Sequence, residues 1–294
     1  MSRILLLAFG LTFFLLQPLY SAEEKVPVDP DRIVIFSDIH CPPQGYQREM
    51  FQKRINDLLT LRPRPAHLLI YGDFAYTKGD VGDYEVLREM MKQVEAAGIA
   101  WDVAFGNHDR RENFAKIFTE RKSAAPDVPD RYISIVDTPK AQFILLDSLI
   151  EGKVDGGIDP PQREWLAKKL AAATKPVFVG CHHPLNETKL ESIFLKSDWF
   201  AGYIYGHNHY WKPVYENGVA TLCLQSTGHW GDIGFVTLDL KEHKAVFELH
   251  QLDAWYPVYG VKPHTYARNP NWEQHVKRNN GSQFVLPLPT GPVK

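Results

Sequence analysis

This sequence has few cysteines and a net charge close to zero. Only three cysteines occur among 294 residues, Cys41, Cys181 and Cys223, which excludes a fold held together by many disulfides. The sequence leaves open whether Cys41 and Cys181 pair. The formal net charge is −2, from 33 Lys and Arg against 35 Asp and Glu, so the basic excess of a nucleic-acid-binding domain is missing. We therefore expect no nucleic-acid polymer as a partner.

Long apolar runs are also missing, except at the N-terminus. Residues 4–16 form an apolar run that follows Arg3 and precedes the small residues Ser21 and Ala22. This layout predicts a signal peptide over residues 1–22, cleaved after Ser21 or Ala22, and hence a secreted or periplasmic protein. The alternative is an uncleaved N-terminal anchor. Because no later segment is apolar enough to cross a membrane, we expect no stable membrane span after cleavage.

Apolar periodicity divides residues 30–254 into alternating strands and helices. Strands are predicted at 32–37, 67–71 and 99–105, with helices at 50–61 and 83–97 between them. Two successive β-helix-β steps indicate a parallel sheet and an α/β fold. Further strands are predicted at 132–136, 141–146, 177–180, 202–205, 211–215, 219–224, 234–240 and 245–252, with helices at 111–121 and 162–173. Residues 255–294 lack clear periodicity, and we expect a partly irregular extension that wraps the surface.

Polar side chains stand where the predicted strands end. They are Asp38, His40, Asp73, Asn107, His108, His182, His207 and His209. In open α/β folds the carboxyl ends of the strands carry the ligand site. Imidazole, carboxylate and amide donors together suit Fe, Mn or Zn, and they suffice for two ions bridged by one carboxylate. Taken singly, each residue could instead belong to a turn or to the surface.

Five short motifs, in order along the chain, favour the metal interpretation. They are Asp38-Ile39-His40, Gly72-Asp73, Gly106-Asn107-His108-Asp109, His182-His183-Pro184 and Gly206-His207-Asn208-His209. Together they resemble the motifs of calcineurin-like metallophosphoesterases, over residues 32–252. The resemblance implies a four-layer α/β/β/α sandwich, in which two packed mixed β-sheets are flanked by helices.

The resemblance also implies a role for each residue. One metal ion would be held by Asp38, His40 and His209, the other by Asn107, His182 and His207, and Asp73 would bridge the two. Asn107 and His108 would contact the substrate. His108 would act as general acid, and Asp109 would orient His108 from behind. A metal-bound hydroxide would attack phosphorus in line with the departing oxygen.

Three further residues near the motifs have open roles. Tyr76 stands three residues after Asp73, as the iron-binding tyrosine of purple acid phosphatases does, but those enzymes lack the histidine that stands here as His40. We therefore expect Tyr76 to lie outside the metal ligands, where it could bind substrate or pack its ring. His183 could bind substrate or pack away from the metals. His229 is the remaining histidine that could reach the pocket.

The expected function is metal-dependent hydrolysis of a small phosphate ester. Among enzymes, the alternative is a phosphodiesterase that acts on cyclic nucleotides, nucleotide diphosphates or phospholipid headgroups. Outside enzymes, it is a catalytically inactive binding module with the same fold. Tyr210, Trp211, Trp230 and Trp255 are candidates for a substrate-pocket wall by position alone. The sequence does not determine the metal, the natural substrate, the choice between monoester and diester, or the oligomeric state.

Overall fold

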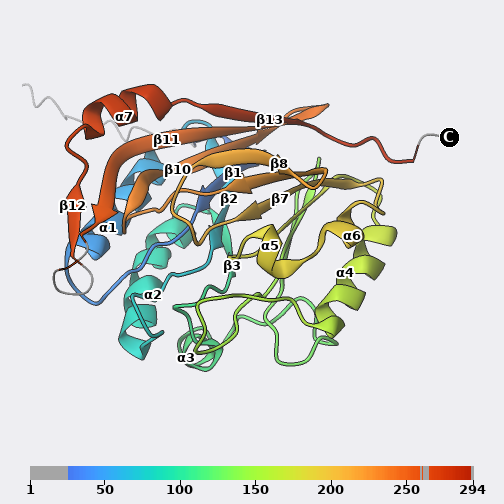
Figure 1. Ribbon diagram of the computed structural model, residues 1–294, viewed down its shortest axis with the longest axis horizontal. Coiled ribbons are helices and arrows are strands. Elements are labelled where there is room, and N and C mark those ends of the chain that lie inside the picture. Colours follow the sequence, from blue (N-terminus) through green and yellow to red (C-terminus); the bar gives the residue numbers. More distant parts are fainter. Residues whose placement is uncertain (1–25, 259, 261–264, 293–294) are drawn as a thin grey trace, which may run out of the picture.

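The computed structural model describes residues 26–258, 260 and 265–292 (Figure 1). The predicted signal peptide, residues 1–22, lies outside these described residues. Within the described part of the chain, no helix has both the length and the apolar character needed to cross a membrane.

The first sheet has seven strands and is mixed. Its order is β12 (Tyr266–Arg268), β11 (Lys244–Pro257), β10 (Gly231–Leu240), β1 (Val28–Phe36), β2 (Arg64–Tyr71) and β3 (Ala100–Ala104), and β13 (Gln283–Pro287) also pairs with β11. Strands β1, β2 and β3 are parallel, whereas β10 is antiparallel to both β1 and β11. Helices α1 (Tyr46–Thr60) and α2 (Val81–Ala96) connect the parallel strands. The carboxyl ends of β1, β2 and β3 therefore lie at one edge of the sheet.

The second sheet has six strands and is also mixed. Its order is β4 (Ser134–Asp137), β5 (Gln142–Leu145), β6 (Val177–Gly180), β7 (Phe200–Tyr205), β9 (Val219–Cys223) and β8 (Lys212–Glu216). Strands β5, β6, β7 and β9 are parallel, and the outer strands β4 and β8 are antiparallel to their neighbours. The sheet thus presents a second row of carboxyl ends.

Four further helices lie between β3 and β7 in the chain. They are α3 (Arg111–Ile117), α4 (Pro160–Ala171), α5 (Leu185–Thr188) and α6 (Glu191–Phe194). Local sequence explains where α4 begins: Pro160 occupies its first turn, and Asp159 accepts the backbone N–H of Gln162 at 3.1 Å.

Three apolar cores separate four layers. Helices α1, α2 and α3 pack on one face of the first sheet, around Val34 and Phe36 of β1. Ile33 and Ile35 alternate with them along β1 and lie in the core between the two sheets. The outer face of the second sheet packs against α4, α5 and α6, around Trp165. The expected α/β/β/α sandwich is confirmed (Figure 1), and residues 33–36 of β1 form a continuous apolar run that is buried on both faces of the sheet.

The C-terminal segment differs from the expectation. The predicted boundary between residues 254 and 255 falls inside β11, which continues to Pro257. The second edge of β11 pairs with β12 at one end and with β13 at the other. Leu286 of β13 is 3% exposed and belongs to the core between the sheets, and α7 (Trp272–Asn279) lies along β11 (Figure 1). Much of this segment is therefore built into the domain rather than wrapped over it.

Candidate metal centre

The strands of both sheets deliver polar side chains to one place. In four strands the side chain stands two residues beyond the last strand residue: Asp38 after β1, Asp73 after β2, His182 after β6 and His207 after β7. Asn107 follows the end of β3, and His40 and His209 extend the first and last of these loops. Groups of three of these Asp and His side chains bring their donor atoms within 4.8 Å of one another. The structure thus brings the predicted ligands together.

The backbone that carries these side chains is held in an unusual conformation. Asp38, His40, Asp73, His207 and His209 all have positive φ angles, between 47° and 69°. Residues with a Cβ enter this left-handed region only at a cost, and such residues concentrate at functional sites. The strained backbone therefore agrees with a functional site, in which the side chains are directed toward a common centre at a cost in backbone energy.

Two motif glycines allow the loops to approach one another closely. A Cβ at Gly206 would lie 2.1 Å from Oγ of Ser37, and a Cβ at Gly106 would lie 2.2 Å from Oδ1 of Asp73. No side chain fits at such separations, so any other residue would force the loops apart. Gly106 and Gly206 are therefore needed for packing between loops of different strands.

Backbone carbonyls fix the orientation of three imidazole rings. Nδ1 of His40, His182 and His209 donates to the carbonyl oxygens of Tyr76, Tyr71 and Trp230, at 3.0, 2.8 and 3.1 Å. A carbonyl can only accept, so the proton sits on Nδ1 in each ring. Nε2 of each ring is then left facing the centre, which is the usual support for a histidine that binds metal.

The first group of donors comprises Asp38, His40, His209 and Asp73. Oδ1 of Asp38 lies 3.1 Å from Nε2 of His209, and Oδ2 of Asp73 lies 3.6 Å from Nε2 of His40. The hydroxyl of Ser37 donates to Oδ2 of Asp38 at 2.6 Å, which leaves Oδ1 directed at the centre. Within the described residues, Nε2 of His40 is buried and has no hydrogen-bond partner.

The second group comprises Asp73 again, with Asn107, His182 and His207. Oδ1 of Asn107 lies 3.2 Å from Nε2 of His182 and 3.0 Å from Nδ1 of His207. Nε2 of His182 lies 3.1 Å from Oδ2 of Asp73, the same oxygen that faces the first group. Oδ1 of Asp73 accepts the backbone N–H of His108 at 2.8 Å. Asp73 therefore belongs to both groups through a single oxygen.

Burial and mutual attraction shift the pKa values of these side chains. Burial raises the pKa of Asp38 and Asp73, but the adjacent histidines outweigh it and hold both pKa values below their ordinary range. Burial lowers the pKa of His182, but the Asp73 and Asp38 carboxylates outweigh it and raise that pKa to about 10. Burial dominates at His40 and His207 and lowers their pKa values to about 3 and about 4. The Asp38 and Asp73 carboxylates are thus ionised, beside a His182 ring that holds a second proton and neutral His40 and His207 rings.

The donor atoms of this arrangement would be better satisfied by bound cations than by one another. The neutral His40 ring presents the lone pair of Nε2 to Oδ2 of Asp73, which is an acceptor as well. A buried ring nitrogen without a partner, such as Nε2 of His40, calls for an ion or water that satisfies it. Imidazole nitrogens with carboxylate and amide oxygens suit Mn, Fe and Zn. The residues present therefore fit two metal ions, one in each donor group.

His108 stands beside the two groups as a more accessible residue. Its Nδ1 donates to the carbonyl oxygen of Thr77 at 2.9 Å, and its Nε2 lies 3.9 Å from Oδ2 of Asp73. The side chain is 29% exposed, whereas that of Asp73 is 3% exposed. Nε2 of His108 is therefore available to an oxygen of a bound substrate.

Asp109 occupies a different place from the one that the motif implied. Its buried carboxylate accepts the backbone N–H groups of Asp73, Ala75 and Gly106, at 3.0, 3.0 and 2.8 Å. The ring of His108 is held by the carbonyl of Thr77 instead. Asp109 thus ties the loop after β2 to the loop after β3, and the expectation that it orients the His108 ring is corrected.

For His183, the structure favours packing away from the metals, one of the two roles that the sequence left open. Its Nε2 donates to the carbonyl oxygen of Val154 at 3.0 Å, and its Nδ1 accepts the Ser148 hydroxyl at 2.7 Å. Burial lowers the pKa of His183 to about 2, so the ring is neutral. The ring lies 4.9 Å from those of His182 and His207, close enough to be grouped with them. With both nitrogens engaged, it supports its neighbours by packing rather than by binding substrate.

Tyr76 and His229 border the first donor group. Tyr76 contributes its backbone carbonyl, which accepts the Nδ1–H of His40. The His229 ring stacks on His40 with centroids 4.0 Å apart, and its Nε2 lies 2.9 Å from the Tyr266 hydroxyl. His229 therefore reaches the site, although the sequence offered no stronger sign of this than its position between Gly228 and Trp230. A contact between the Tyr76 phenol and substrate stays a prediction.

The three cysteines are free thiols in the interior. Cys41 and Cys181, whose pairing the sequence left open, do not form a disulfide. Burial raises the pKa values of Cys41, Cys181 and Cys223 to about 12, about 11 and about 12. Because protonated thiols are poor metal ligands, the cysteines belong to the core and not to the donor groups.

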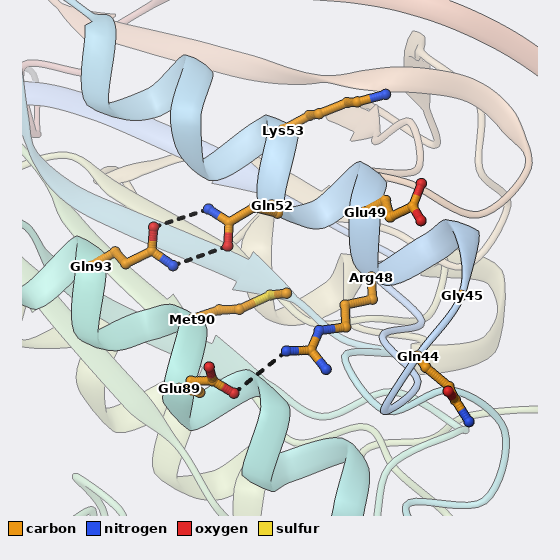
Figure 2. A pocket seen from close by; sticks show the side chains of 9 residues that line it. All are labelled: Gln44, Gly45, Arg48, Glu49, Gln52, Lys53, Glu89, Met90 and Gln93. Atoms are coloured by element: carbon orange, nitrogen blue, oxygen red, sulfur yellow. Dashed lines mark hydrogen bonds and ion pairs between the residues drawn. The ribbon is translucent and has the colours of Figure 1, made fainter.

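A hollow between α1 and α2 is a poorer candidate for a site. Figure 2 shows its lining side chains, and none of them is a predicted metal ligand. The amides of Gln52 and Gln93 bond to each other at 2.9 and 3.0 Å, and Arg48 pairs with Glu89 at 3.5 Å. Since these polar groups satisfy one another across the hollow, they do not converge on a ligand.

Comparison with known families agrees with this geometry. The family described as Calcineurin-like phosphoesterase matches residues 31–211, a stretch that contains both donor groups. The fold and the site define a metal-dependent phosphoesterase. The chain belongs to the calcineurin-like phosphoesterase family.

Two relatives with broad alignments carry phosphodiesterase names. The chain is 27% identical over 263 residues to "Probable glycerophosphodiester phosphodiesterase GpdQ" of Arcobacter nitrofigilis, with 79% of this chain and 92% of the relative covered. It is 25% identical over 197 residues to "Probable cyclic nucleotide phosphodiesterase" of Psychrobacter arcticus, with 60% and 68% covered.

Solved structures share the fold. A dimetal phosphatase from Danio rerio has a TM-score of 0.62 at 15% identity, covering 75% of this chain and 96% of that one. Purple acid phosphatase PPD1 from yellow lupin has a TM-score of 0.55 at 16% identity, covering 75% and 51%. At these identities the likeness concerns the architecture.

Proposed function

We propose that this enzyme hydrolyses a small phosphodiester at a centre of two metal ions drawn from Fe, Mn and Zn. The observation that carries the proposal is the pair of donor groups that share Oδ2 of Asp73. Asp38, His40 and His209 would complete one group, and Asn107, His182 and His207 the other. When bound, two such ions neutralise charge on the phosphoryl oxygens and lower the pKa of a water molecule, which provides the nucleophile.

The chain's own residues have three tasks in this scheme. The carbonyls behind His40, His182 and His209 accept the Nδ1–H groups, so the Nε2 atoms are directed at the centre, where they could bind metal. Asp109 holds the loops after β2 and β3 together, which fixes Asp73 relative to Asn107. These contacts preorganise the donors, so little reorganisation is needed during the reaction.

His108 would supply the proton to the departing oxygen. Its Nδ1–H is bonded to the Thr77 carbonyl, so the proton that it donates would be carried by Nε2. When that proton is transferred to the leaving alkoxide, the ring returns to the neutral form with Nδ1–H still bonded. Transfer by a positioned histidine contributes about 10²–10⁴-fold to a rate.

A diester is favoured over a monoester by the charges near the centre. A phosphodiester carries one negative charge, whereas a phosphomonoester carries up to about two at neutral pH. Among the described residues, the interactions of the predicted ligands involve histidine, asparagine, aspartate, serine and backbone groups, with no Lys or Arg side chain. The phosphodiesterase names of two relatives support the same choice.

Metal analysis and a pair of chromogenic esters test this proposal. We expect the purified protein to hold transition metal and to hydrolyse bis(p-nitrophenyl) phosphate with a higher kcat/KM than p-nitrophenyl phosphate. Dialysis against a chelator should abolish both activities, and added Mn²⁺ should restore them. Preference for the monoester would contradict the diester assignment. Absence of metal and of turnover for both esters would point to the inactive binding module instead.

Export of the enzyme belongs to the same proposal and is supported by the signal pattern of residues 1–22. We expect the protein in the secreted or periplasmic fraction of its cell, with an N-terminus that begins after Ser21 or Ala22. N-terminal sequencing of the fractionated protein checks this. A cytoplasmic protein that retains Met1 would contradict export.

A further inference from the structure

An aromatic cleft borders the metal centre. It encloses about 680 Å³ and, in the described part of the chain, is lined by Tyr210, Trp230, Tyr256, Pro257 and Val258. That volume falls within the roughly 300–1,000 Å³ typical of small-molecule sites. None of these lining side chains carries a formal charge, so the cleft is suited to a neutral group.

Trp230 forms the wall between the cleft and the metal centre. Its ring lies 4.2 Å from the ring of His209, and its carbonyl accepts Nδ1–H of His209 at 3.1 Å. Tyr210 follows His209 in the chain, and its ring lies 6.0 Å from that of Trp230. The rings of Trp230 and Tyr210 therefore lie beside one of the predicted metal ligands.

The third ring comes from the C-terminal part of the first sheet. Tyr256 lies near the end of β11, where it pairs with Ala267 of β12. Tyr210 and Tyr256 are 46% and 41% exposed, so part of each ring is accessible to a ligand. Three segments far apart in the sequence thus place aromatic faces around one hollow.

Two other aromatic candidates named from the sequence lie elsewhere. Trp211 packs against the core between the sheets. The Trp255 ring lies 5.0 Å from that of Tyr46, and its Nε1 is buried. The aromatic character of the cleft is therefore a property of Tyr210, Trp230 and Tyr256, and it does not extend to every neighbouring tryptophan.

We propose that this cleft, formed by Tyr210, Trp230 and Tyr256, binds a planar aromatic group of the phosphodiester, such as a nucleobase. The proposal rests on the proposed function, because it places the organic group of a substrate whose phosphate lies at the metal centre. Aromatic faces bind planar rings by stacking without needing charge or a fixed hydrogen-bond pattern. A glycerol group, by contrast, offers no planar face to these rings.

Phenyl phosphate and methyl phosphate provide a matched pair of probes. Both carry the same phosphate, and only phenyl phosphate has a ring for the cleft. With the metal-loaded protein, we expect calorimetry to show phenyl phosphate binding about tenfold more tightly than methyl phosphate, since stacking on one ring contributes about that factor. Tyr210→Ala and Tyr256→Ala should each remove most of this preference and leave methyl phosphate binding within about twofold of wild type.

Tyr215→Ala is the control, because Tyr215 is a 67% exposed tyrosine of β8 that does not line the cleft. It should keep the full preference for phenyl phosphate. In turnover, Tyr256→Ala should raise KM for adenosine 3′,5′-cyclic phosphate about tenfold with little change in kcat.

Two results would overturn the proposal, and they are distinguishable. If wild-type protein binds both probes but the two cleft variants keep the phenyl preference, the cleft does not bind the ring and the proposed function stands. If wild-type protein binds neither probe and hydrolyses no ester, the proposed function fails and the cleft assignment fails with it. Metal content and methyl phosphate binding show that each variant remains folded.

Discussion

At the scale of single residues, the proposed centre separates side chains that would hold metal from one that would face substrate. His40, His182 and His209 each have Nδ1 fixed by a carbonyl and Nε2 turned inward. His108 is anchored in the same way, to Thr77, but its Nε2 lies 3.9 Å from Asp73 and its side chain is partly exposed. The same contact, from Nδ1–H to a backbone carbonyl, therefore orients both the proposed metal ligands and the proposed general acid. The position of Nε2 distinguishes the two roles.

The general-acid role of His108 predicts a dependence on the leaving group. His108→Ala should lower kcat for an alkyl leaving group by about 10²–10⁴-fold, because an alkoxide needs a proton to depart. The loss should be much smaller for p-nitrophenolate, which leaves without one. Steady-state kinetics on the two kinds of ester measures the difference.

The matched control for this variant is His243→Ala, because His243 is a surface residue whose side chain is 78% exposed. It should leave both rates unchanged. An equal loss on both kinds of ester in His108→Ala would show that His108 acts on substrate binding or metal binding instead.

Buried thiols give a second prediction at this scale. Burial raises the pKa values of Cys41, Cys181 and Cys223 to about 12, about 11 and about 12, so they remain protonated and unreactive in the native protein. Ellman's reagent at pH 8 should label none of the three in native protein and all three after denaturation. The unfolded chain begins to lose these protons near a pH of about 8.5, so the thiols should also destabilise the fold as pH rises above that value. Rapid native labelling would contradict their burial.

At the scale of elements, the sequence predicts strands that are apolar and locally bounded. A parallel strand that is buried on both faces is apolar along its length, so it can be recognised without knowing its neighbours. This explains why β1, with its run Ile33–Phe36, and also β2, β3, β6 and β7 were predictable, each followed by one of the motifs. Strand β13 escapes prediction because only Leu286 is buried within it. Its existence depends on pairing with β11, which no local pattern records.

The integration of β13 can be tested with two neighbouring residues. Leu286→Ala should lower the free energy of unfolding by about 2–5 kcal/mol, because Leu286 is 3% exposed in the core between the sheets. Val285→Ala, on the opposite face of β13 and 45% exposed, should change it by about 0.5 kcal/mol or less. Urea unfolding followed by circular dichroism measures both. Equal and small effects would mean that β13 does not contribute to the core.

Loop contacts explain which site assignments the sequence could support. Asp38, Asp73, Asn107, His182 and His207 are predictable because each stands just beyond a strand. The hydrogen-bond partners of Asp109 and His183 could not be predicted, because they lie in loops whose positions depend on tertiary packing. Asp109 bonds to the backbone after β2, and His183 bonds to Ser148 and Val154. A motif identifies a side chain, whereas its hydrogen-bond partners are set by the whole fold.

At the scale of the whole molecule, two sheets meet so that each contributes half of the centre. Strands β1, β2 and β3 of the first sheet provide Asp38, His40, Asp73 and Asn107, whereas β6 and β7 of the second provide His182, His207 and His209. The core between the sheets therefore aligns the two donor groups as well as stabilising the fold. Asp73 is the side chain on which both groups depend, since one of its oxygens faces a histidine from each sheet.

Metal stoichiometry in an Asp73 variant tests the dinuclear centre most directly. Elemental analysis by mass spectrometry should find two metal ions per chain in the wild-type protein, and a substantial loss from both sites in Asp73→Asn, with activity reduced at least about a hundredfold. Asp127→Asn, the same change at an exposed position, should retain both ions and full activity. An Asp73→Asn protein that keeps two ions and normal turnover would contradict a centre shared through Asp73.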